Sequence, residues 1–181
     1  MKIVRLGPDE VFHRYLTPKW AFVPLSGAGA AIDGGRFNRP GVEALYLSGA
    51  PQTALEEFRQ GASIAPPATL AAYKITLDQV ADLSAGYDPA GWPNEWAEWD
   101  SNWRKIARIE KKIPPSWLLS DGLIEAGCRG LLFPSLQHAG GVNLVVFTAN
   151  LTKVDKVAVY DPDGHLPQDQ SSWPTVSRPS T

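Results

Sequence analysis

The stretch Ala44-Leu-Tyr-Leu-Ser-Gly-Ala-Pro-Gln-Thr-Ala-Leu-Glu-Glu-Phe-Arg-Gln60 holds two different structural patterns in immediate succession. Its first part, Ala44–Ser48, is short and apolar and carries an aromatic ring, which is typical of a strand. Pro51 then stands where proline is favoured, at the first position of a helix, and Gly61 is placed to end that helix after about Gln60. A strand followed directly by a helix predicts a fold of mixed α and β structure.

The predicted helix gives its two adjacent glutamates different surroundings. On a helical wheel of 100° per residue, Ala54, Leu55 and Phe58 define the buried side. Glu57 falls nearer to that side, and Glu56 points further toward solvent. Glu57 is therefore the better candidate for a carboxylate with a function.

Further elements follow along the chain. Strands are predicted at 72–77, 130–133, 143–148 and 154–160, with one helix after Pro93 to about Lys111 and another from Ser116 to Ala126. Residues 1–20 show no clear period. The segment Pro24–Gly35 holds four glycines and is predicted to be a loop that brings backbone close to a ligand. The fold class is α+β, as one mixed domain over 1–160 with a proline- and serine-rich tail over 161–181.

Composition excludes several classes of protein. The chain has 181 residues, 44% of them hydrophobic, and a formal charge of −2, so it is globular and has no overall cationic field for nucleic acid or anionic lipid. Cys128 has no cysteine partner, and the three histidines lack zinc-site spacing. Nothing resembles a signal or membrane segment. We expect a cytoplasmic protein that binds no metal, no membrane and no nucleic acid directly.

A tryptophan stripe marks the first of the two later helices. Trp96, Trp99, Trp103 and Ile106 recur at helical spacing, and a cationic cluster follows near the end of the helix: Arg104, Lys105, Arg108, Lys111 and Lys112. Base stacking by such a stripe needs a cationic groove along the same face. The pattern favours a core or a protein interface instead, because helical aromatic spacing usually marks a buried face.

No common catalytic signature is present, such as a nucleophile elbow, a P-loop or a dinucleotide-binding glycine motif. What remains is a polar set attached to short strands and their edges: Arg36, Tyr46, Glu57 and Ser135. Taken singly, each has an ordinary structural explanation, as a turn cation, a packed ring, a solvated carboxylate and a strand end.

Taken together, these residues resemble the RES domain, a family named for its Arg, Glu and Ser. The resemblance covers roughly residues 12–160. It rests on these segments: Pro24-Leu-Ser-Gly-Ala-Gly-Ala, Gly34-Gly-Arg-Phe-Asn, Leu45-Tyr-Leu with Thr53-Ala-Leu-Glu-Glu57, and Phe133-Pro-Ser135 with Asn143 downstream. The chain carries Phe37 where many members have tryptophan, a change between flat aromatic rings that should preserve packing.

The resemblance implies an ADP-ribosyltransferase-like fold and the toxin of a bacterial toxin–antitoxin pair, with an Xre-like, DNA-binding antitoxin as partner. It implies NAD⁺ as substrate, not as a recycled cofactor. Most members of the family degrade NAD⁺ by hydrolysis or phosphorolysis, arresting growth. Others transfer ADP-ribose to a protein such as phosphoribosyl pyrophosphate synthetase. The sequence does not choose between these enzymes.

The residue types suit cleavage of the bond between nicotinamide and ribose. We expect Glu57 to stabilise the oxocarbenium-like ribosyl centre and Arg36 to bind the pyrophosphate. Tyr46 would line the nicotinamide pocket, and Ser135 would bind ribose or carboxamide. Asn143 and the glycine loop that starts at Gly27 complete the predicted substrate-binding set.

Two readings from other classes remain open. The domain could be a binding module that has lost catalysis and docks a partner through its tryptophan-rich helix. It could also bind single-stranded nucleic acid through the same stripe, which would make retention of oligonucleotides depend on salt.

Overall fold

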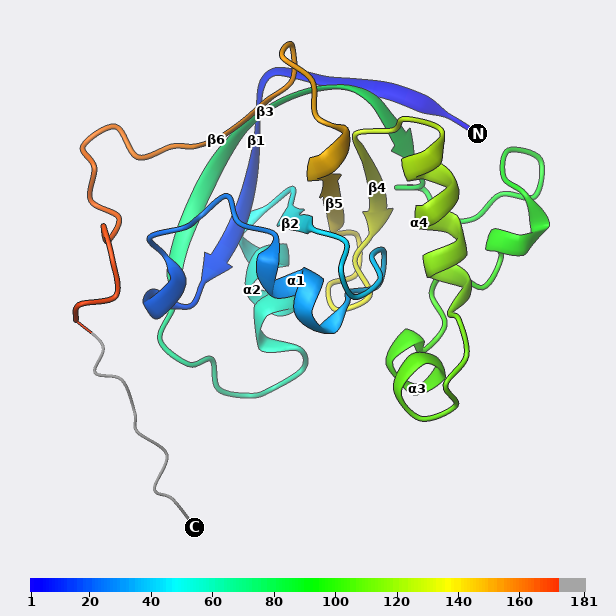
Figure 1. The fold of residues 1–181 in the computed structure, drawn as a ribbon, viewed down its shortest axis with the longest axis horizontal. Helices are drawn as coiled ribbons and strands as arrows, with labels where there is room; N and C mark the ends of the chain where they lie inside the picture. The colour runs from blue at the N-terminus through cyan, green and yellow to red at the C-terminus, as the bar shows by residue number, and fades with distance from the viewer. Residues whose placement is uncertain (173–181) are drawn as a thin grey trace.

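The computed structural model describes residues 1–172, in which strands and helices are intermixed along the chain (Figure 1). The strands are β1 (Ile3–Leu16), β2 (Ala44–Ser48), β3 (Thr69–Asp82), β4 (Gly130–Pro134), β5 (Val142–Phe147) and β6 (Lys156–Val159). The helices are α1 (Ala28–Asp33), α2 (Pro51–Arg59), α3 (Trp103–Arg108) and α4 (Pro115–Glu125), with 3-10 turns at Pro18–Trp20, Asn94–Trp96 and Thr148–Asn150. This arrangement confirms the α+β fold class.

The sheet closes on itself, and one of its junctions is much shorter than the others. Its strand order is β1-β2-β5-β4-β3-β6, and β1 also pairs with β3, so that five strands form a ring. The long strands β1 and β3 run side by side (Figure 1), antiparallel over most of their length. In contrast, β1 pairs with β2 only at His13 and Ser48. Both residues line a cavity, which lies where the two strands are least tightly joined.

The alternation of side chains along β2, β5 and β4 divides the interior into two cores. On β2, Leu45 and Leu47 face the first core, which also receives Phe12 of β1 and Tyr73 of β3. Residues of the opposite parity face the second core, which α4 and the tryptophan-rich segment cover: Ala44, Leu131, Phe133, Val145 and Phe147. The face of β2–β5–β4 that meets the second core is also the face on which the site residues lie.

Most of the predicted elements are confirmed. The strand at 44–48 and the helix from Pro51 match β2 and α2. The residue that caps α2, Gln60, takes a left-handed conformation just before Gly61. The four later strands and the helix near 116–126 are also present. The long strand β1 was not predicted, because register shifts between Val4 and Glu10 interrupt the alternation of side chains.

Two local predictions are wrong. The segment 94–111 is not one helix, because the side chain of Asn102 caps a new one by accepting a hydrogen bond from the backbone N–H of Lys105 at 3.1 Å. Trp99 and Trp103 are nevertheless buried, as the core interpretation required. The loop predicted at 24–35 contains the short helix α1. Residues 173–181 of the predicted tail lie outside the described residues.

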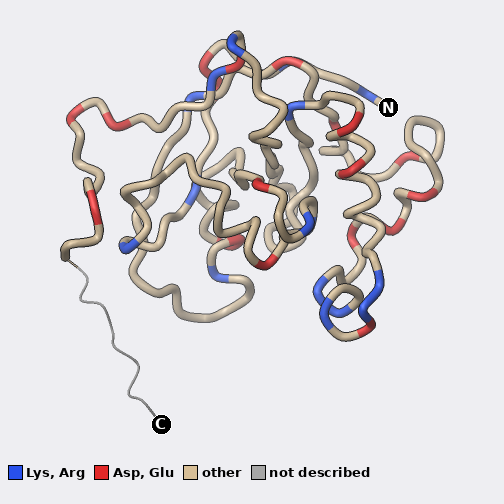
Figure 2. Tube along the Cα trace, viewed as in Figure 1, with Lys and Arg blue, Asp and Glu red and all other residues tan. Residues whose placement is uncertain are grey.

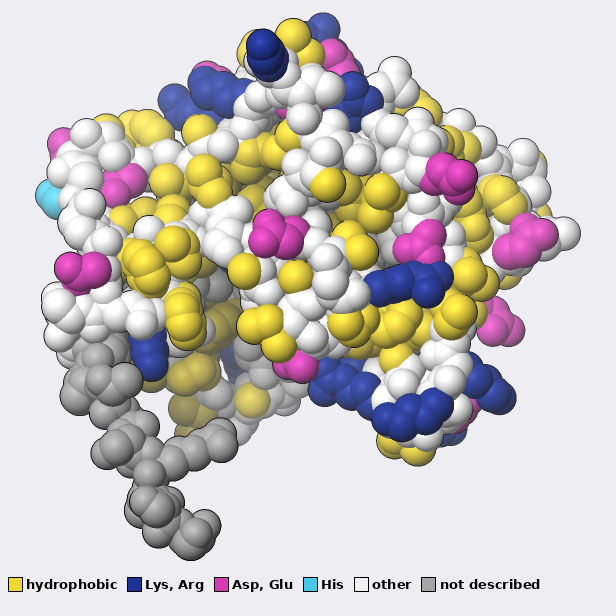
Figure 3. All heavy atoms as spheres, in the orientation of Figure 1, with side chains coloured by type: hydrophobic (Ala, Val, Ile, Leu, Met, Phe, Trp, Pro, Cys, Tyr) yellow, Lys and Arg dark blue, Asp and Glu magenta, His cyan; other side chains and the backbone are white. Residues whose placement is uncertain are grey.

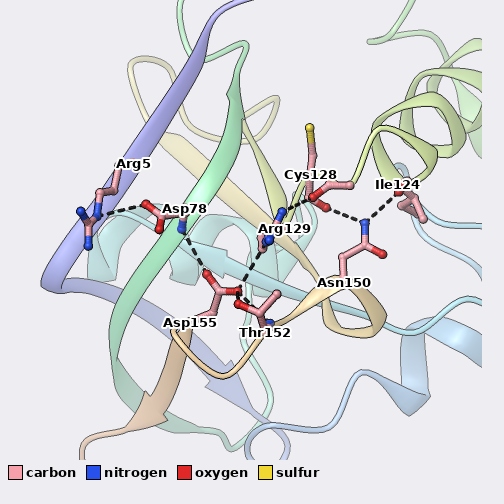
Figure 4. Close-up of polar contacts among 9 residues, drawn as sticks. Arg5, Asp78, Ile124, Cys128, Arg129, Asn150, Thr152 and Asp155 are labelled. Atoms are coloured by element: carbon pink, nitrogen blue, oxygen red, sulfur yellow. Dashed lines mark hydrogen bonds and ion pairs between the residues drawn. The ribbon is translucent and has the colours of Figure 1, made fainter.

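A buried polar cluster holds β6 to the rest of the sheet (Figure 4). The Asp155 carboxylate accepts hydrogen bonds from the Thr152 backbone N–H at 2.8 Å and from its hydroxyl at 2.7 Å. It also accepts one from the Asp78 backbone N–H at 3.2 Å and pairs with Arg129 at 3.5 Å. The cluster fixes the turn that leads into β6.

Within residues 1–172, none of the helices has the length and apolar character needed to cross a membrane.

Candidate active site

The site begins with the register of β2 against β5. Ser48 and Asn143 are directly opposite each other in the antiparallel pair, and Asn143 is in turn opposite Phe133 of β4. Tyr46 lies two residues before Ser48 and so faces the same side of the sheet. The short turn after β4 then carries Ser135, which is buried beside this face. Residues from three separate parts of the chain, on β2, on β5 and after β4, are thereby brought to one place on the sheet.

Glu57 reaches this place from α2. Its Oε1 atom accepts hydrogen bonds from the Ser135 hydroxyl at 2.7 Å and from the Asn143 side-chain amide at 2.6 Å. Glu56 instead pairs with Arg59 at 3.5 Å and accepts a hydrogen bond from Gln52 at 2.8 Å, away from the sheet. The two glutamates therefore have different partners, although both are half-buried.

Neighbouring groups determine which way both donors point. The Ser48 hydroxyl donates to Asn143 Oδ1 at 2.7 Å, so that the amide nitrogen of Asn143 faces Glu57. The Ser135 oxygen accepts from the backbone N–H groups of Gln137 at 3.1 Å and His138 at 3.0 Å, which leaves its single proton for Glu57. One carboxylate oxygen is therefore held by two oriented donors.

The other carboxylate oxygen is much less engaged. Among the described residues, Oε2 of Glu57 has one contact, with the amide of the exposed Gln60 at 3.4 Å. Glu57 lines two adjoining cavities, of about 180 and 250 Å³, and shares both linings with Tyr46 and Phe133. Together these cavities fall within the ~300–1,000 Å³ usual for small-molecule sites. The arrangement leaves one oxygen available to a ligand.

Tyr46 supports the turn that carries Arg36. Its hydroxyl accepts a hydrogen bond from the Phe37 backbone N–H at 2.9 Å and donates to Asn38 Oδ1 at 2.8 Å. Burial raises the pKa of Tyr46 far above its ordinary value, against the opposing effects of that N–H group and of two nearby arginines. The phenol is therefore neutral at physiological pH, and its hydroxyl holds the turn at Phe37 and Asn38 by hydrogen bonds.

Gly35 allows this turn to approach Tyr46. A Cβ atom at Gly35 would lie 2.5 Å from both Asn38 Oδ1 and the Tyr46 hydroxyl. Any side chain there would displace the ring. Gly34 and Gly35 line the larger of the two cavities, so this part of the predicted glycine loop lies beside the candidate site.

Arg36 lines the same cavity, but part of its guanidinium is already bound. Its Nη1 atom donates to the carbonyl oxygens of Trp99 at 3.0 Å and Ser101 at 2.8 Å. Burial lowers the pKa of Arg36; Asp100 opposes that effect and the positive charge of Arg104 adds to it. The guanidinium remains a cation with further N–H donors for an anion.

The structure brings together Arg36, Tyr46, Glu57, Ser135 and Asn143 of the predicted set. Gly27 is apart from them and lines neither cavity. It precedes α1, and a Cβ atom there would lie 2.8 Å from the backbone nitrogen of Ala44. The lack of a side chain at Gly27 thus allows α1 to pack closely against β2.

Sequence reasoning missed further lining residues. His13, Arg14 and Tyr15 of β1 line the smaller cavity, and Tyr15 stacks on Phe58 of α2 with ring centroids 5.7 Å apart. The unrecognised strand β1 concealed them. Arg104, which the sequence places in the cationic cluster near the end of the predicted helix, also lines the larger cavity. Within residues 1–172, no group of three or more acidic, histidine or cysteine side chains is placed to hold a metal ion.

Comparison with protein families gives a match to the RES domain over residues 11–169. The chain belongs to the RES family. Among solved structures, a similar one is the crystal structure of the M. tuberculosis MbcT-MbcA toxin-antitoxin complex, with a TM-score of 0.57 and 23% identity over 87% of this chain and 84% of that one. A search of curated proteins found no match. In this RES domain, Arg36 and Glu57 line the larger cavity, and Ser135 donates a hydrogen bond to Glu57.

Proposed function

We propose that this RES domain is the toxin of a toxin–antitoxin pair and cleaves the bond between nicotinamide and ribose in NAD⁺. The observation that carries the proposal is the asymmetric binding of Glu57. Ser135 and Asn143 hold Oε1 at 2.7 and 2.6 Å, whereas Oε2 has only the long contact with Gln60, and Glu57 lines two adjoining cavities.

In the proposed reaction the C–N bond breaks, and nicotinamide leaves with the bonding electron pair as a neutral molecule. A positive charge develops on the ribose ring. Oε2 of Glu57 accepts a hydrogen bond from a ribose hydroxyl and stabilises that charge. Water then attacks the anomeric carbon and loses a proton to solvent, giving ADP-ribose; inorganic phosphate in place of water would give the phosphorolysis product.

The surrounding residues support binding and orientation. The remaining N–H groups of Arg36 suit a pyrophosphate, which accepts paired hydrogen bonds from a planar guanidinium. The Tyr46 ring, fixed by its hydroxyl contacts, forms a wall for nicotinamide. No step requires a histidine base, a thiol or a metal.

We also propose an Xre-like antitoxin as partner and the cytoplasm as the site of action. The similar solved structure is a toxin-antitoxin complex, which supports the partnership, and the family resemblance implies the class of antitoxin. Protein ADP-ribosylation is the second candidate. It is favoured by an apolar groove of about 500 Å³ that adjoins the site through Arg14, Tyr15 and Phe58 and could seat a protein acceptor.

The test compares wild-type protein, Glu57→Ala and Glu56→Ala. Purified protein is incubated with labelled NAD⁺, with and without phosphate, and with cell extract, while cellular NAD⁺ and growth are followed after brief induction. Cleavage lost only in Glu57→Ala supports the proposal. Label transferred to one protein band supports ADP-ribosylation, and intact NAD⁺ under every condition would leave a non-catalytic binding module.

A further inference from the structure

A second arginine lies at the cavity that Arg36 lines. Arg104 comes from α3, and its exposed guanidinium stacks on Trp103 with its carbon 4.7 Å from the ring centroid. Stacking of this kind restricts a long side chain to few conformations. The cavity, of about 250 Å³, thus has two guanidinium groups on its lining together with Glu57.

Arg36 itself fixes the segment that carries Arg104. By donating to the carbonyl oxygens of Trp99 and Ser101, it fastens the chain immediately before α3. A second attachment comes from Trp117, whose indole N–H donates to the Gly35 carbonyl at 2.8 Å and whose ring packs on Trp103 at 6.2 Å. The position of α3 beside the glycine turn is therefore determined by specific contacts on both sides.

Neither arginine has a counter-ion in the described part of the chain. Within residues 1–172, no carboxylate comes within ion-pair distance of Arg36 or Arg104, although Asp100 and Glu57 act on Arg36 at longer range. Two cations held near each other without a partner repel, and an anion between them would remove that repulsion.

The surroundings of Arg104 strengthen its positive field. Lys and Arg gather around α3, at the lower right of the molecule (Figures 2 and 3). Of this cluster, Lys105 and Lys112 share the carboxylate of Glu110, at 3.6 and 3.8 Å. The chain as a whole has a formal charge of −2. The excess of positive charge around α3 is therefore local, and it would attract anions to the side of the cavity where Arg104 lies.

We propose that Arg104 is a substrate-binding residue and forms, with Arg36, a subsite for phosphate oxygens at the larger cavity. The inference rests on the proposed function and extends it, since Arg36 alone has only part of its guanidinium available. The phosphate oxygens can come from the diphosphate of the dinucleotide or from a free phosphate ion that serves as nucleophile. Both are doubly charged groups of the kind that two guanidinium cations bind.

The experiment measures the dissociation constants of ADP-ribose, inorganic phosphate and nicotinamide for the wild type, Arg104→Ala, Arg104→Lys and Lys105→Ala. Lys105→Ala is the matched control, because the substitution removes the same charge from the same helix and Lys105 does not line the cavity. We expect Arg104→Ala to weaken ADP-ribose about tenfold, Arg104→Lys to weaken it less, and Lys105→Ala to change it less than about twofold. Nicotinamide, which has no phosphate, should bind equally to all four proteins.

The arms separate the possible outcomes. Loss of ADP-ribose affinity with unchanged phosphate affinity assigns the subsite to the diphosphate, and the reverse assigns it to the free ion. Unchanged affinities for both in Arg104→Ala, or equal losses in Lys105→Ala, overturn the inference. A wild type that binds ADP-ribose but leaves NAD⁺ intact contradicts the proposed function and not the subsite.

Discussion

The side-chain amide of Asn143 donates to Oε1 of Glu57 across 2.6 Å, although the two residues are 86 positions apart in the chain. The contact exists because β5 pairs with β2 in a register that places Asn143 opposite Ser48, at the end of the sheet that α2 crosses. A carboxylate held by such a donor from a strand has little freedom to rotate. That rigidity is what electrostatic stabilisation of a developing charge requires.

Ser48 is predicted to affect NAD⁺ cleavage by orienting the side-chain amide of Asn143 toward Glu57. Its hydroxyl holds Asn143 Oδ1 at 2.7 Å, and without it the amide can turn its oxygen toward the carboxylate. We expect Asn143→Ala to lower kcat for NAD⁺ cleavage about tenfold to hundredfold and Ser48→Ala to lower it about threefold to tenfold, with KM little changed. Steady-state kinetics on purified variants measure both numbers.

Ser116→Ala serves as the control for Ser48→Ala. Ser116 is equally buried, and its hydroxyl has no hydrogen-bond partner among the described residues. It should keep full activity and full stability. If Ser48→Ala matched this control in kcat, Ser48 would have no positioning role.

Tyr46→Phe should cost stability. The substitution leaves the buried N–H of Phe37 without its acceptor and the Asn38 side-chain oxygen without its donor. We expect the free energy of unfolding to fall by about 2 kcal/mol, measured by urea titration. Tyr87→Phe is the comparison, since its hydroxyl bond to Asn94 is exposed to solvent, and it should lose less than about 0.5 kcal/mol. Equal losses in the two variants would show that the Tyr46 hydroxyl does not support the turn.

Gly35→Ala should displace the same turn by steric contact. The new methyl group would lie 2.5 Å from the Tyr46 hydroxyl and from Asn38 Oδ1, so one of them must move. We expect a loss of about 2 kcal/mol or more in stability, together with weaker NAD⁺ binding. Gly29→Ala, in α1 with no atom within 4 Å of its added methyl, should be neutral or stabilising by up to ~1 kcal/mol. Retention of wild-type stability by Gly35→Ala would contradict the assigned packing.

Local sequence patterns predicted those elements whose ends carry strong signals. The Pro51 start and the Gly61 end delimited α2, and short apolar runs indicated most of the strands. The local patterns failed where a side chain binds backbone groups that a continuous helix would use. Asn102 starts a new helix inside 94–111, and the carbonyl oxygens of Trp99 and Ser101 bind Arg36 instead of continuing one. Neither event is visible without the tertiary fold.

The site was accessible to sequence reasoning only in part. The helical wheel separated Glu57 from Glu56. Arg36, Tyr46 and Ser135 stood out as polar residues at strand edges, and the resemblance to a family added Asn143. The contact of Ser48 with Asn143 depends on the register of two strands far apart in the chain, which no local pattern encodes. Arg14 was missed for a different reason, because bulges concealed the strand that carries it.

The buried carboxylate of Asp155 gives a prediction about pH. Its side chain is 1% exposed, and burial by itself would raise its pKa. Hydrogen bonds from Thr152 and from the Asp78 backbone, with the charge of Arg129, outweigh burial and hold the pKa of Asp155 below its ordinary value. Asp155→Asn should therefore lose about 3 kcal/mol at neutral pH, because Arg129 keeps its charge without a carboxylate partner.

The sign of the pH dependence follows from the lowered pKa. The unfolded chain binds a proton at Asp155 near pH ~4, before the folded protein does, so the stabilisation is present above that pH and is lost as the pH falls through the lower folded-state pKa. Urea unfolding from about pH 7 to about pH 3 should show a constant difference between wild type and Asp155→Asn down to about pH 5, and a shrinking one below about pH 4. Asp78→Asn, which removes only the exposed pair with Arg5, should cost less than about 1 kcal/mol throughout. A difference for Asp155→Asn that grows on acidification would mean that its carboxylate is destabilised by burial and not stabilised by its donors.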